Sequence, residues 1–229
     1  MRGGSMTGVE APLPRGGLRL AWAIGLAMIP VWGAHTSVEA ACTTSWDNTA
    51  HYHRGSPSAD TCNGEDHSTG HNEYFYTEGD GDTVNAAGSA ANYADIIEPA
   101  GGYDVVDGQG GYDSIRAGEG CDTVRGGYWG DLIHMGESSC QWDDALGEDG
   151  ADEIHGSYGY DLMRGGPDND RIYDDCCGGE NEKDRICGGA GSDVGNTADG
   201  DSFDYVYGDV ESPVTDPYEY ASSQPCGIL

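Results

Sequence analysis

Residues 102–133 read GYDVVDGQGGYDSIRAGEGCDTVRGGYWGDLI. An Asp recurs there every nine residues, at Asp104, Asp113, Asp122 and Asp131, and an apolar side chain follows each Asp two residues later. Gly is concentrated before each Asp, which is typical of turns. Each unit therefore predicts a six-residue turn ending in Asp and a polar–apolar–polar triplet, a minimal strand with one inward side chain.

The same unit continues on both sides of this stretch. Asp95 precedes it by nine residues, and Asp152, Asp161, Asp170, Asp184 and Asp193 follow it after two insertions. The apolar partners are Ile97, Val106, Ile115, Val124, Ile133, Ile154, Met163, Ile172 and Ile186, and only Gly195 breaks the rule. A fixed short period of this kind predicts a solenoid.

The expected fold is all-β, a parallel β-roll (β-solenoid) of nonapeptide repeats with two repeats per coil and short irregular caps. Gly at this density argues against helices. Two units of nine residues close one coil, so equivalent Asp residues stack along two edges. Asp104 would lie over Asp122 on one edge, and Asp95, Asp113 and Asp131 would follow one another on the other.

Stacked Gly-rich turns that end in Asp favour calcium binding. Calcium takes about six to eight oxygen ligands, and such turns offer carboxylates together with backbone carbonyls that no side chain covers. Without a cation the same stacking would bring like charges together. Because the inward Ile and Val side chains are few, we expect folding to depend on several bound Ca²⁺ ions.

The pattern Gly-Gly-x-Gly-x-Asp-x-apolar-x resembles the RTX (hemolysin-type) calcium-binding repeats. It is explicit at residues 188–193 and looser over 102–172, and the resemblance covers about residues 95–207. It implies a parallel β-roll with calcium between adjacent turns. The metal ligands would be Asp95, Asp104, Asp113, Asp122, Asp131, Asp152, Asp161, Asp170, Asp184 and Asp193. The turns before Asp170 and Asp184 lack the central Gly and predict the weakest sites.

Charge excludes several partners. The 229 residues include 10 Lys or Arg and 41 Asp or Glu, a formal net charge of −31. Such a chain repels phosphates, so it is not expected to bind nucleic acid or an anionic membrane surface. A disordered acidic polymer is the alternative that composition alone would allow. The shared phase of Gly and Asp argues against it.

The first forty residues have the features of an export signal. Arg2, Arg15 and Arg19 precede an uncharged apolar run at 20–34, and small residues fit cleavage after Ala40. No second apolar stretch follows, so no membrane span is expected after removal of a signal peptide at 1–40. The expected location is secreted, periplasmic or on the cell surface.

All eight cysteines follow the predicted cleavage site, which predicts disulfide bonds in an exported chain. Eight cysteines allow 105 connectivities, so the sequence does not fix the pairs. Cys121 and Cys140 are about one coil apart and are predicted to pair. Cys187 is predicted to pair with Cys176 or Cys177 on the same argument. Typical RTX proteins have few cysteines and a C-terminal secretion signal, so this chain departs from that pattern.

The predicted roll at 93–207 leaves an N-terminal cap region at 41–92 and a C-terminal cap at 208–229. Solvated histidines are expected in the N-terminal cap, although His-x-His can also bind a metal; they are His51, His53, His67 and His71. Several tyrosines occupy turn positions: Tyr103, Tyr112, Tyr128, Tyr158 and Tyr160. Packing between turns is the expected role of these rings, and a glycan-contacting face is the alternative.

The sequence offers no catalytic set. A zinc-protease His-Glu-x-x-His motif and a Gly-x-Ser-x-Gly elbow are both missing from the chain. We therefore expect a non-enzymatic, exported calcium-binding repeat protein with a structural, adhesive or matrix-binding role. Its expected partners are calcium ions and an extracellular glycan or matrix. The alternative is a polysaccharide-acting enzyme or its targeting module.

Overall fold

The computed structural model describes residues 40–47, 50–64, 71–88, 93–136, 142–174, 184–196, 205–207 and 220–222. They belong to one compact unit, Val38–Leu229. The predicted signal peptide and the predicted C-terminal cap lie outside these residues, apart from Ala40 and the short strand Tyr220–Ser222. In the described part of the chain, no helix is long and apolar enough to cross a membrane.

The described residues form β-strands in two sheets. Sheet one contains, in spatial order, β1 (Ala40–Ala41), β4 (Asp60–Asn63), β6 (Thr83–Asn85), β9 (Val105–Asp107), β11 (Thr123–Tyr128), β13 (Asp144–Asp149), β15 (Leu162–Pro167), β17 (Arg185–Ala190), β19 (Tyr205–Tyr207) and β20 (Tyr220–Ser222). Sheet two contains, in spatial order, β2 (Thr43–Trp46), β3 (Ala50–Arg54), β5 (Asn72–Tyr76), β7 (Ile96–Glu98), β10 (Ser114–Gly120), β12 (Leu132–Gly136), β14 (Glu153–His155), β16 (Arg171–Tyr173) and β18 (Val194–Asn196). The short strand β8 (Gly101–Gly102) pairs with the end of β10.

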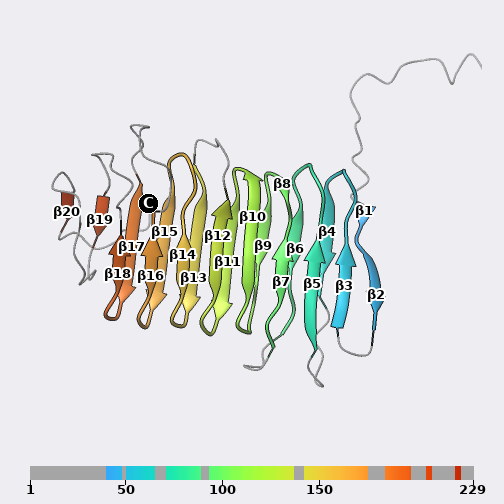
Figure 1. Ribbon diagram of the computed structural model, residues 1–229, viewed down its shortest axis with the longest axis horizontal. Coiled ribbons are helices and arrows are strands. Elements are labelled where there is room, and N and C mark those ends of the chain that lie inside the picture. Colours follow the sequence, from blue (N-terminus) through green and yellow to red (C-terminus); the bar gives the residue numbers. More distant parts are fainter. Residues whose placement is uncertain are drawn as a thin grey trace, which may run out of the picture. The chain divides into compact units, whose positions relative to one another are not determined.

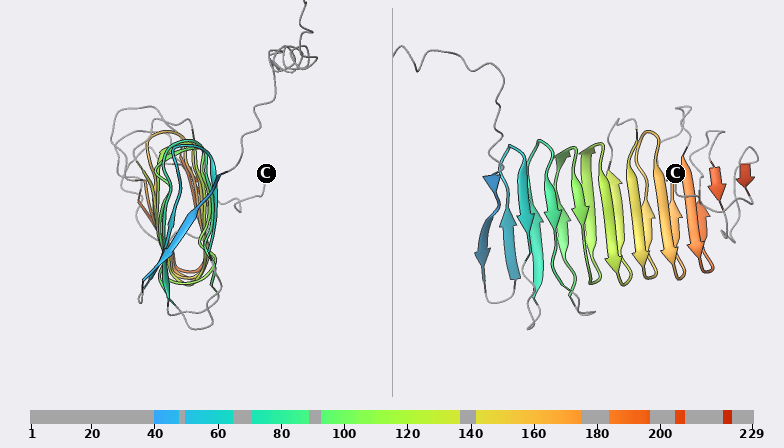
Figure 2. Two further views of the ribbon diagram at one scale, coloured as in Figure 1. Left: turned by 90° about the vertical axis from the view of Figure 1, so that its right-hand side faces the viewer. Right: turned by 180° about the vertical axis from the view of Figure 1, so that it is seen from behind.

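The chain passes from one sheet to the other and back, so each circuit adds one strand to each sheet (Figure 1). In sheet two, Ile97 pairs with Ile115 and Ile115 with Ile133, in parallel register. An end-on view shows the two sheets facing each other across a narrow, flattened coil (Figure 2). The prediction of an all-β parallel solenoid with two repeats per coil is confirmed.

The core is a thin layer between the sheets, with one inward side chain from most strands. All nine predicted apolar partners are buried. They stack in register, Val106 with Val124 in sheet one and Ile133 with Ile154 in sheet two. Because each coil buries only two such side chains, apolar burial per residue is small and other groups must help to hold the coils together.

The solenoid extends into the region predicted as the N-terminal cap. Strands β3 and β5 join sheet two, and β4 and β6 join sheet one, all through parallel pairs with the following coils. Only β2 departs from this arrangement, because it pairs antiparallel with β3. The stack therefore starts well before residue 93, and β2 lies at its N-terminal end.

A disulfide joins Cys42 to Cys62, 20 residues apart, and links the residue between β1 and β2 to β4. Cys121 and Cys187 are also disulfide-bonded. Their predicted partners, Cys140 and the Cys176–Cys177 pair, lie outside the described residues.

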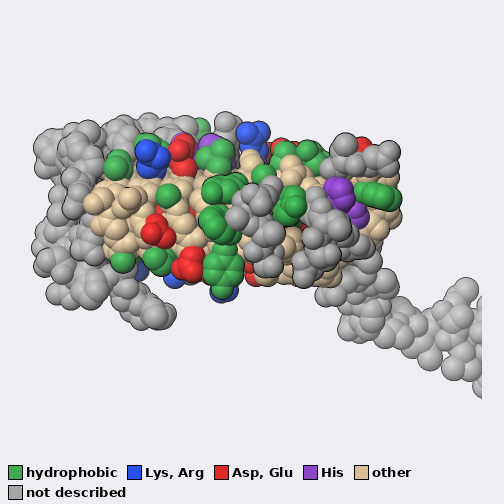
Figure 3. All heavy atoms as spheres, turned by 90° about the horizontal axis from the view of Figure 1, so that it is seen from below, with side chains coloured by type: hydrophobic (Ala, Val, Ile, Leu, Met, Phe, Trp, Pro, Cys, Tyr) green, Lys and Arg blue, Asp and Glu red, His purple; other side chains and the backbone are tan. Residues whose placement is uncertain are grey.

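The turn tyrosines do not pack between coils as expected. Tyr103 is 74% exposed, Tyr128 is 61% exposed and Tyr112 is 52% exposed. Figure 3 shows the edge of the solenoid formed by the turns from sheet one to sheet two, such as those between β11 and β12 and between β13 and β14. Hydrophobic side chains gather in the middle of this described surface. The rings point outward because turn positions face solvent, while the inward position of each repeat belongs to the strand.

Candidate metal centre

Two rows of buried carboxylates run along the solenoid, one at the start of each sheet's strands. Row one consists of Asp60, Asp82, Asp104, Asp122, Asp143, Asp161 and Asp184. Row two consists of Glu73, Asp95, Asp113, Asp131, Asp152, Asp170 and Asp193. None of these side chains is more than 3% exposed. Every predicted metal-binding Asp belongs to one of the two rows.

One carboxylate oxygen of each row member after Asp60 and Glu73 is used between coils. The backbone N–H of Asp113 donates to Oδ1 of Asp131, 2.8 Å away, and the N–H of Asp104 donates to Oδ1 of Asp122 at 2.9 Å. The same bond repeats along both rows, with N···O distances of 2.5–3.1 Å. Each Asp therefore joins its coil to the preceding one at the point where the turn becomes a strand.

The second carboxylate oxygen has no hydrogen-bond partner in the middle of the rows. This holds for Oδ2 of six described residues: Asp104, Asp113, Asp122, Asp131, Asp152 and Asp170. Two other row members differ, because Ser157 donates its hydroxyl to Oδ2 of Asp143 and its N–H to Oδ2 of Asp161. A buried acceptor without a donor is costly, so the unpaired oxygens indicate a missing proton or cation.

Burial raises the pKa of the row carboxyls, because the charged form loses its hydration. The pKa of Asp131 rises to about 9 and that of Asp95 to about 8. Asp113, Asp122 and Asp152 reach about 7, and Asp104, Asp161 and Asp170 reach about 6. Backbone hydrogen bonds oppose this rise, and neighbouring row carboxylates add to it at Asp131 and Asp122. Without a cation, much of the middle of the rows is therefore protonated near neutral pH.

Glycine five residues before Asp113, Asp131, Asp152 and Asp170 of row two leaves space beside the unpaired oxygen. A Cβ on Gly147 would collide with Oδ2 of Asp152 and lie 2.7 Å from the carbonyl oxygen of Gly165 in the next coil. A Cβ on Gly126 would likewise collide with Oδ2 of Asp131 and lie 2.8 Å from the carbonyl oxygen of Gly147. A carboxylate oxygen and a carbonyl oxygen from adjacent coils thus face the same small volume.

These donors fit a hard cation. Calcium prefers carboxylate and carbonyl oxygens and tolerates irregular geometry. Within the described ranges, no three His, Cys, Asp or Glu side chains converge on one point. A cation at the rows would therefore draw much of its coordination from backbone carbonyls, which the Gly-rich turns leave uncovered.

Four row members were not among the predicted ligands. Asp143 lies nine residues before Asp152 and two before Ala145, a signal that the small size of Ala obscured. Glu73 lies nine residues before Asp82 and two before Phe75, but it is not an Asp. Asp60 and Asp82 are each 22 residues from the next member of row one, so they do not follow the 18-residue period of the coils. Register within the row, rather than spacing, identifies them.

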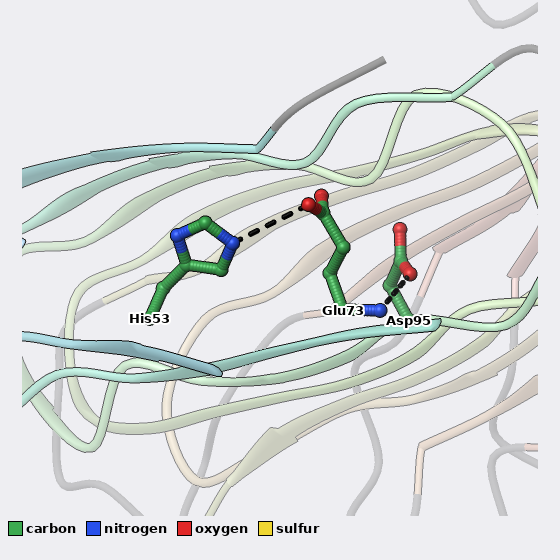
Figure 4. A network of polar contacts seen from close by, with 3 residues as sticks. All are labelled: His53, Glu73 and Asp95. Atoms are coloured by element: carbon green, nitrogen blue, oxygen red, sulfur yellow. Dashed lines mark hydrogen bonds and ion pairs between the residues drawn. The ribbon is translucent and has the colours of Figure 1, made fainter. Parts of the chain in front are cut away.

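Row two ends in a buried pair. Glu73 holds the row position, and its longer side chain turns toward His53, whose Nε2 lies 3.3 Å from Oε1 (Figure 4). His53 occupies the inward position that Phe75 and Ile97 hold in the next coils, and its ring stacks on Phe75 with centroids 4.4 Å apart. The expectation that His53 is solvated is wrong, because its side chain is fully buried. A residue at an inward strand position is buried whatever its polarity, and here the Glu supplies the partner.

Fold and rows together define the class: a parallel β-solenoid repeat protein with stacked, buried carboxylates. The chain matches no known family model, no curated protein and no solved structure. Its repeat pattern and the geometry of the rows are therefore the features that point to its function.

Proposed function

We propose that this chain is an exported calcium-binding repeat protein of the RTX type, with a structural, adhesive or matrix-binding role. Ca²⁺ would lie along rows one and two, between the turns of adjacent coils. The single observation that carries the proposal is the series of buried Asp Oδ2 atoms without hydrogen-bond donors, which in row two face the same small volume as a glycine carbonyl of the next coil.

Calcium would supply what the thin core lacks. Each ion would replace the protons that buried carboxyls otherwise hold, and carboxylate and carbonyl oxygens of adjacent coils would hold it. Binding energy at such sites becomes folding energy, because the unfolded chain has no preformed site. The chain would stay loose where calcium is scarce and become rigid outside the cell, where affinities of about 10⁻⁴–10⁻³ M suffice.

The disulfide between Cys42 and Cys62 supports an exported location, since such bonds persist in oxidising compartments. The export signal at 1–40 belongs to the same proposal. We assign the protein no catalytic step, because the carboxylates at the rows are engaged between coils and hold the fold together.

The test is a calcium titration of the oxidised chain, followed by far-ultraviolet circular dichroism, with magnesium as the control ion. We expect a β signal that grows with calcium and responds weakly to magnesium, which binds less irregular sites. Asp131→Asn keeps the oxygen that accepts the Asp113 N–H but removes a charge from the middle of row two. It should raise the calcium midpoint by roughly tenfold, about 1.4 kcal/mol.

Glu119→Gln is the matched control, because it removes one charge from an exposed residue. Glu119 lies near the C-terminal end of β10, and row two lies at the N-terminal end of that strand. Its calcium midpoint should equal that of the parent chain. An equal shift in both variants would attribute the effect to net charge and reject the site. A chain that shows no calcium response at all would reject the proposed function.

A further inference from the structure

One turn edge of the solenoid presents a cluster of exposed aromatic rings that the rows do not explain. Tyr112 belongs to the turn between β9 and β10, Tyr128 is the last residue of β11, and Trp129 begins the turn between β11 and β12. Trp129 is 44% exposed, and its ring centroid lies 6.1 Å from that of Tyr112. Hydrophobic side chains gather on this edge with acidic side chains beside them (Figure 3).

Trp129 stands where the backbone favours glycine. Gly111 and Gly150 hold the equivalent position, two residues before the Asp, in the adjacent coils on either side. Trp129 has φ of +81°, in the left-handed region that is an outlier for a bulky side chain. The ring nevertheless stays 44% exposed. A bulky, exposed side chain at a backbone position that costs energy points to a functional site.

The rings border an acidic recess. Tyr128 and Trp129 line it together with Asp149, Gly150 and Asp168 from the next two coils, and its volume is about 430 Å³. A second recess of about 420 Å³ adjoins it and shares Tyr128 and Asp149. Asp149 and Asp168 are exposed, so their carboxylates face outward and are not members of the buried rows. Both recesses are open to solvent along the turn edge.

Aromatic rings beside carboxylates favour a particular class of ligand. The electron-rich faces of Tyr and Trp attract the C–H groups of a pyranose ring and also cations. The carboxylates accept hydrogen bonds from hydroxyls and pair with ammonium groups. A net charge of −31 repels uronic-acid and sulfated polymers. A sugar polymer that carries positive charge meets all three conditions.

We propose that Tyr112, Tyr128, Trp129, Asp149 and Asp168 form a binding edge for a glycan with free amino groups, a polymer of glucosamine type. Pyranose rings would stack on Trp129 and the two tyrosines, and ammonium groups would pair with the two carboxylates. This proposal deepens the matrix-binding role given above. It rests on the folded solenoid and uses none of the row carboxylates.

The test is isothermal titration of the calcium-treated full chain with a hexamer of β-1,4-linked glucosamine. Trp129→Gly restores the residue of the adjacent coils, so it should leave the thermal midpoint equal or higher while weakening binding by at least about tenfold. Tyr103→Ala removes an exposed ring from the opposite turn edge and should bind as the parent does. Equal affinity of Trp129→Gly and the parent would overturn the proposal.

A comparison of ligands separates the contribution of the ammonium groups from that of the sugar rings. The fully N-acetylated hexamer lacks the ammonium groups and should bind at least about tenfold more weakly, and Asp149→Asn with Asp168→Asn should remove that difference. Equal binding of both hexamers would overturn the charge selection. Competition by spermidine as effective as the glucosamine hexamer would overturn the role of the sugar ring.

The calcium proposal and the glycan proposal fail in distinguishable ways. Circular dichroism reports whether the chain is folded in calcium and in chelator, and binding is then measured in each folded condition. A chain folded in chelator that binds the hexamer would reject calcium-driven folding and keep the glycan edge. A chain that folds with calcium and does not bind the hexamer would keep calcium-driven folding and reject the glycan edge.

Discussion

At the scale of single residues, the buried Asp is the feature that sets the behaviour of the chain. Each row Asp donates its N–H to one coil and accepts at Oδ1 from another, so the residue is a structural link before it is a ligand. Its second oxygen stays buried without a donor in the middle of the rows. Such an atom must take a proton or a cation, and pH decides between them.

We therefore expect opposite pH dependence with and without calcium. In the metal-free chain the row pKa values, about 6 to about 9, lie above the unfolded value of 3.8. Groups with raised pKa values stabilise the fold fully below the unfolded pKa, and this stability is lost as pH rises through the folded pKa values. The metal-free chain should thus be more stable at pH 5 than at pH 9.

With saturating calcium the trend should reverse, since the ion competes with protons for the same oxygens. Urea unfolding at pH 5, 7 and 9, in chelator and in calcium, measures both trends. Metal-free stability that increases toward pH 9 would show that the row carboxyls are not protonated in the folded chain.

At the scale of the repeat, the strand positions are predictable from sequence and the turn lengths are not. Asp-x-apolar spacing identifies the inward residues from Ile97 to Ile186, and all of them are buried. Insertions lengthen individual coils to 21, 22 or 23 residues while the strands keep their pairing. Extra residues loop out from a turn at little cost because they remain in water. Spacing alone therefore missed Asp60 and Asp82, whose coils are 22 residues long.

The exposed rings show a second limit of the same kind. Tyr112 and Tyr128 occur in turns, and sequence does not say whether a turn side chain lies along the stack or points away from it. The left-handed backbone of Trp129 is also invisible in sequence, since Gly at the equivalent positions is the only hint. Only the folded backbone brings these rings to one edge.

The glycine that precedes four row-two Asp residues by five positions gives a prediction about the repeat. Gly147→Ala would place a methyl group against Oδ2 of Asp152 and the Gly165 carbonyl, where the proposed ion lies. We expect a loss of about 1–3 kcal/mol of unfolding free energy in calcium, as for other overpacked sites. Calorimetric or denaturant unfolding in calcium measures it.

Gly79→Ala is the control for that experiment. Its added Cβ would have no neighbour closer than the Gly101 carbonyl oxygen at 3.8 Å, so stability should change by less than about 0.5 kcal/mol. Equal losses in the two variants would mean that Gly matters here for chain flexibility and not for the space beside the row.

At the scale of the whole molecule, the solenoid is nearly one-dimensional. Each coil contacts only its neighbours, so unfolding proceeds most easily from the ends. The disulfide between Cys42 and Cys62 closes a 20-residue loop at the N-terminal end. It should oppose fraying there in the state with least calcium.

Replacing Cys42 by Ser should therefore destabilise the first coils selectively, by about 3 kcal/mol on the chain-entropy estimate. Hydrogen exchange followed by mass spectrometry measures this by region. Peptides covering β4 and β6 should exchange faster, while peptides covering β12 and β14 should be unchanged. Uniform acceleration along the chain would show that the coils unfold as one cooperative unit.

The antiparallel strand β2 has a consequence for how copies of the molecule meet. A bare parallel coil is a template on which an identical molecule can continue the stack, and repeated addition would build a fibre. All four residues of β2 are exposed, and its direction is opposite to that of β3. Antiparallel pairing changes the spacing of the backbone N–H and C=O groups that the edge strand presents to a second molecule. On sheet two, a second copy that approached the N-terminal end would contact a strand that runs opposite to the other strands of the sheet. We therefore expect β2 to oppose end-to-end polymerisation.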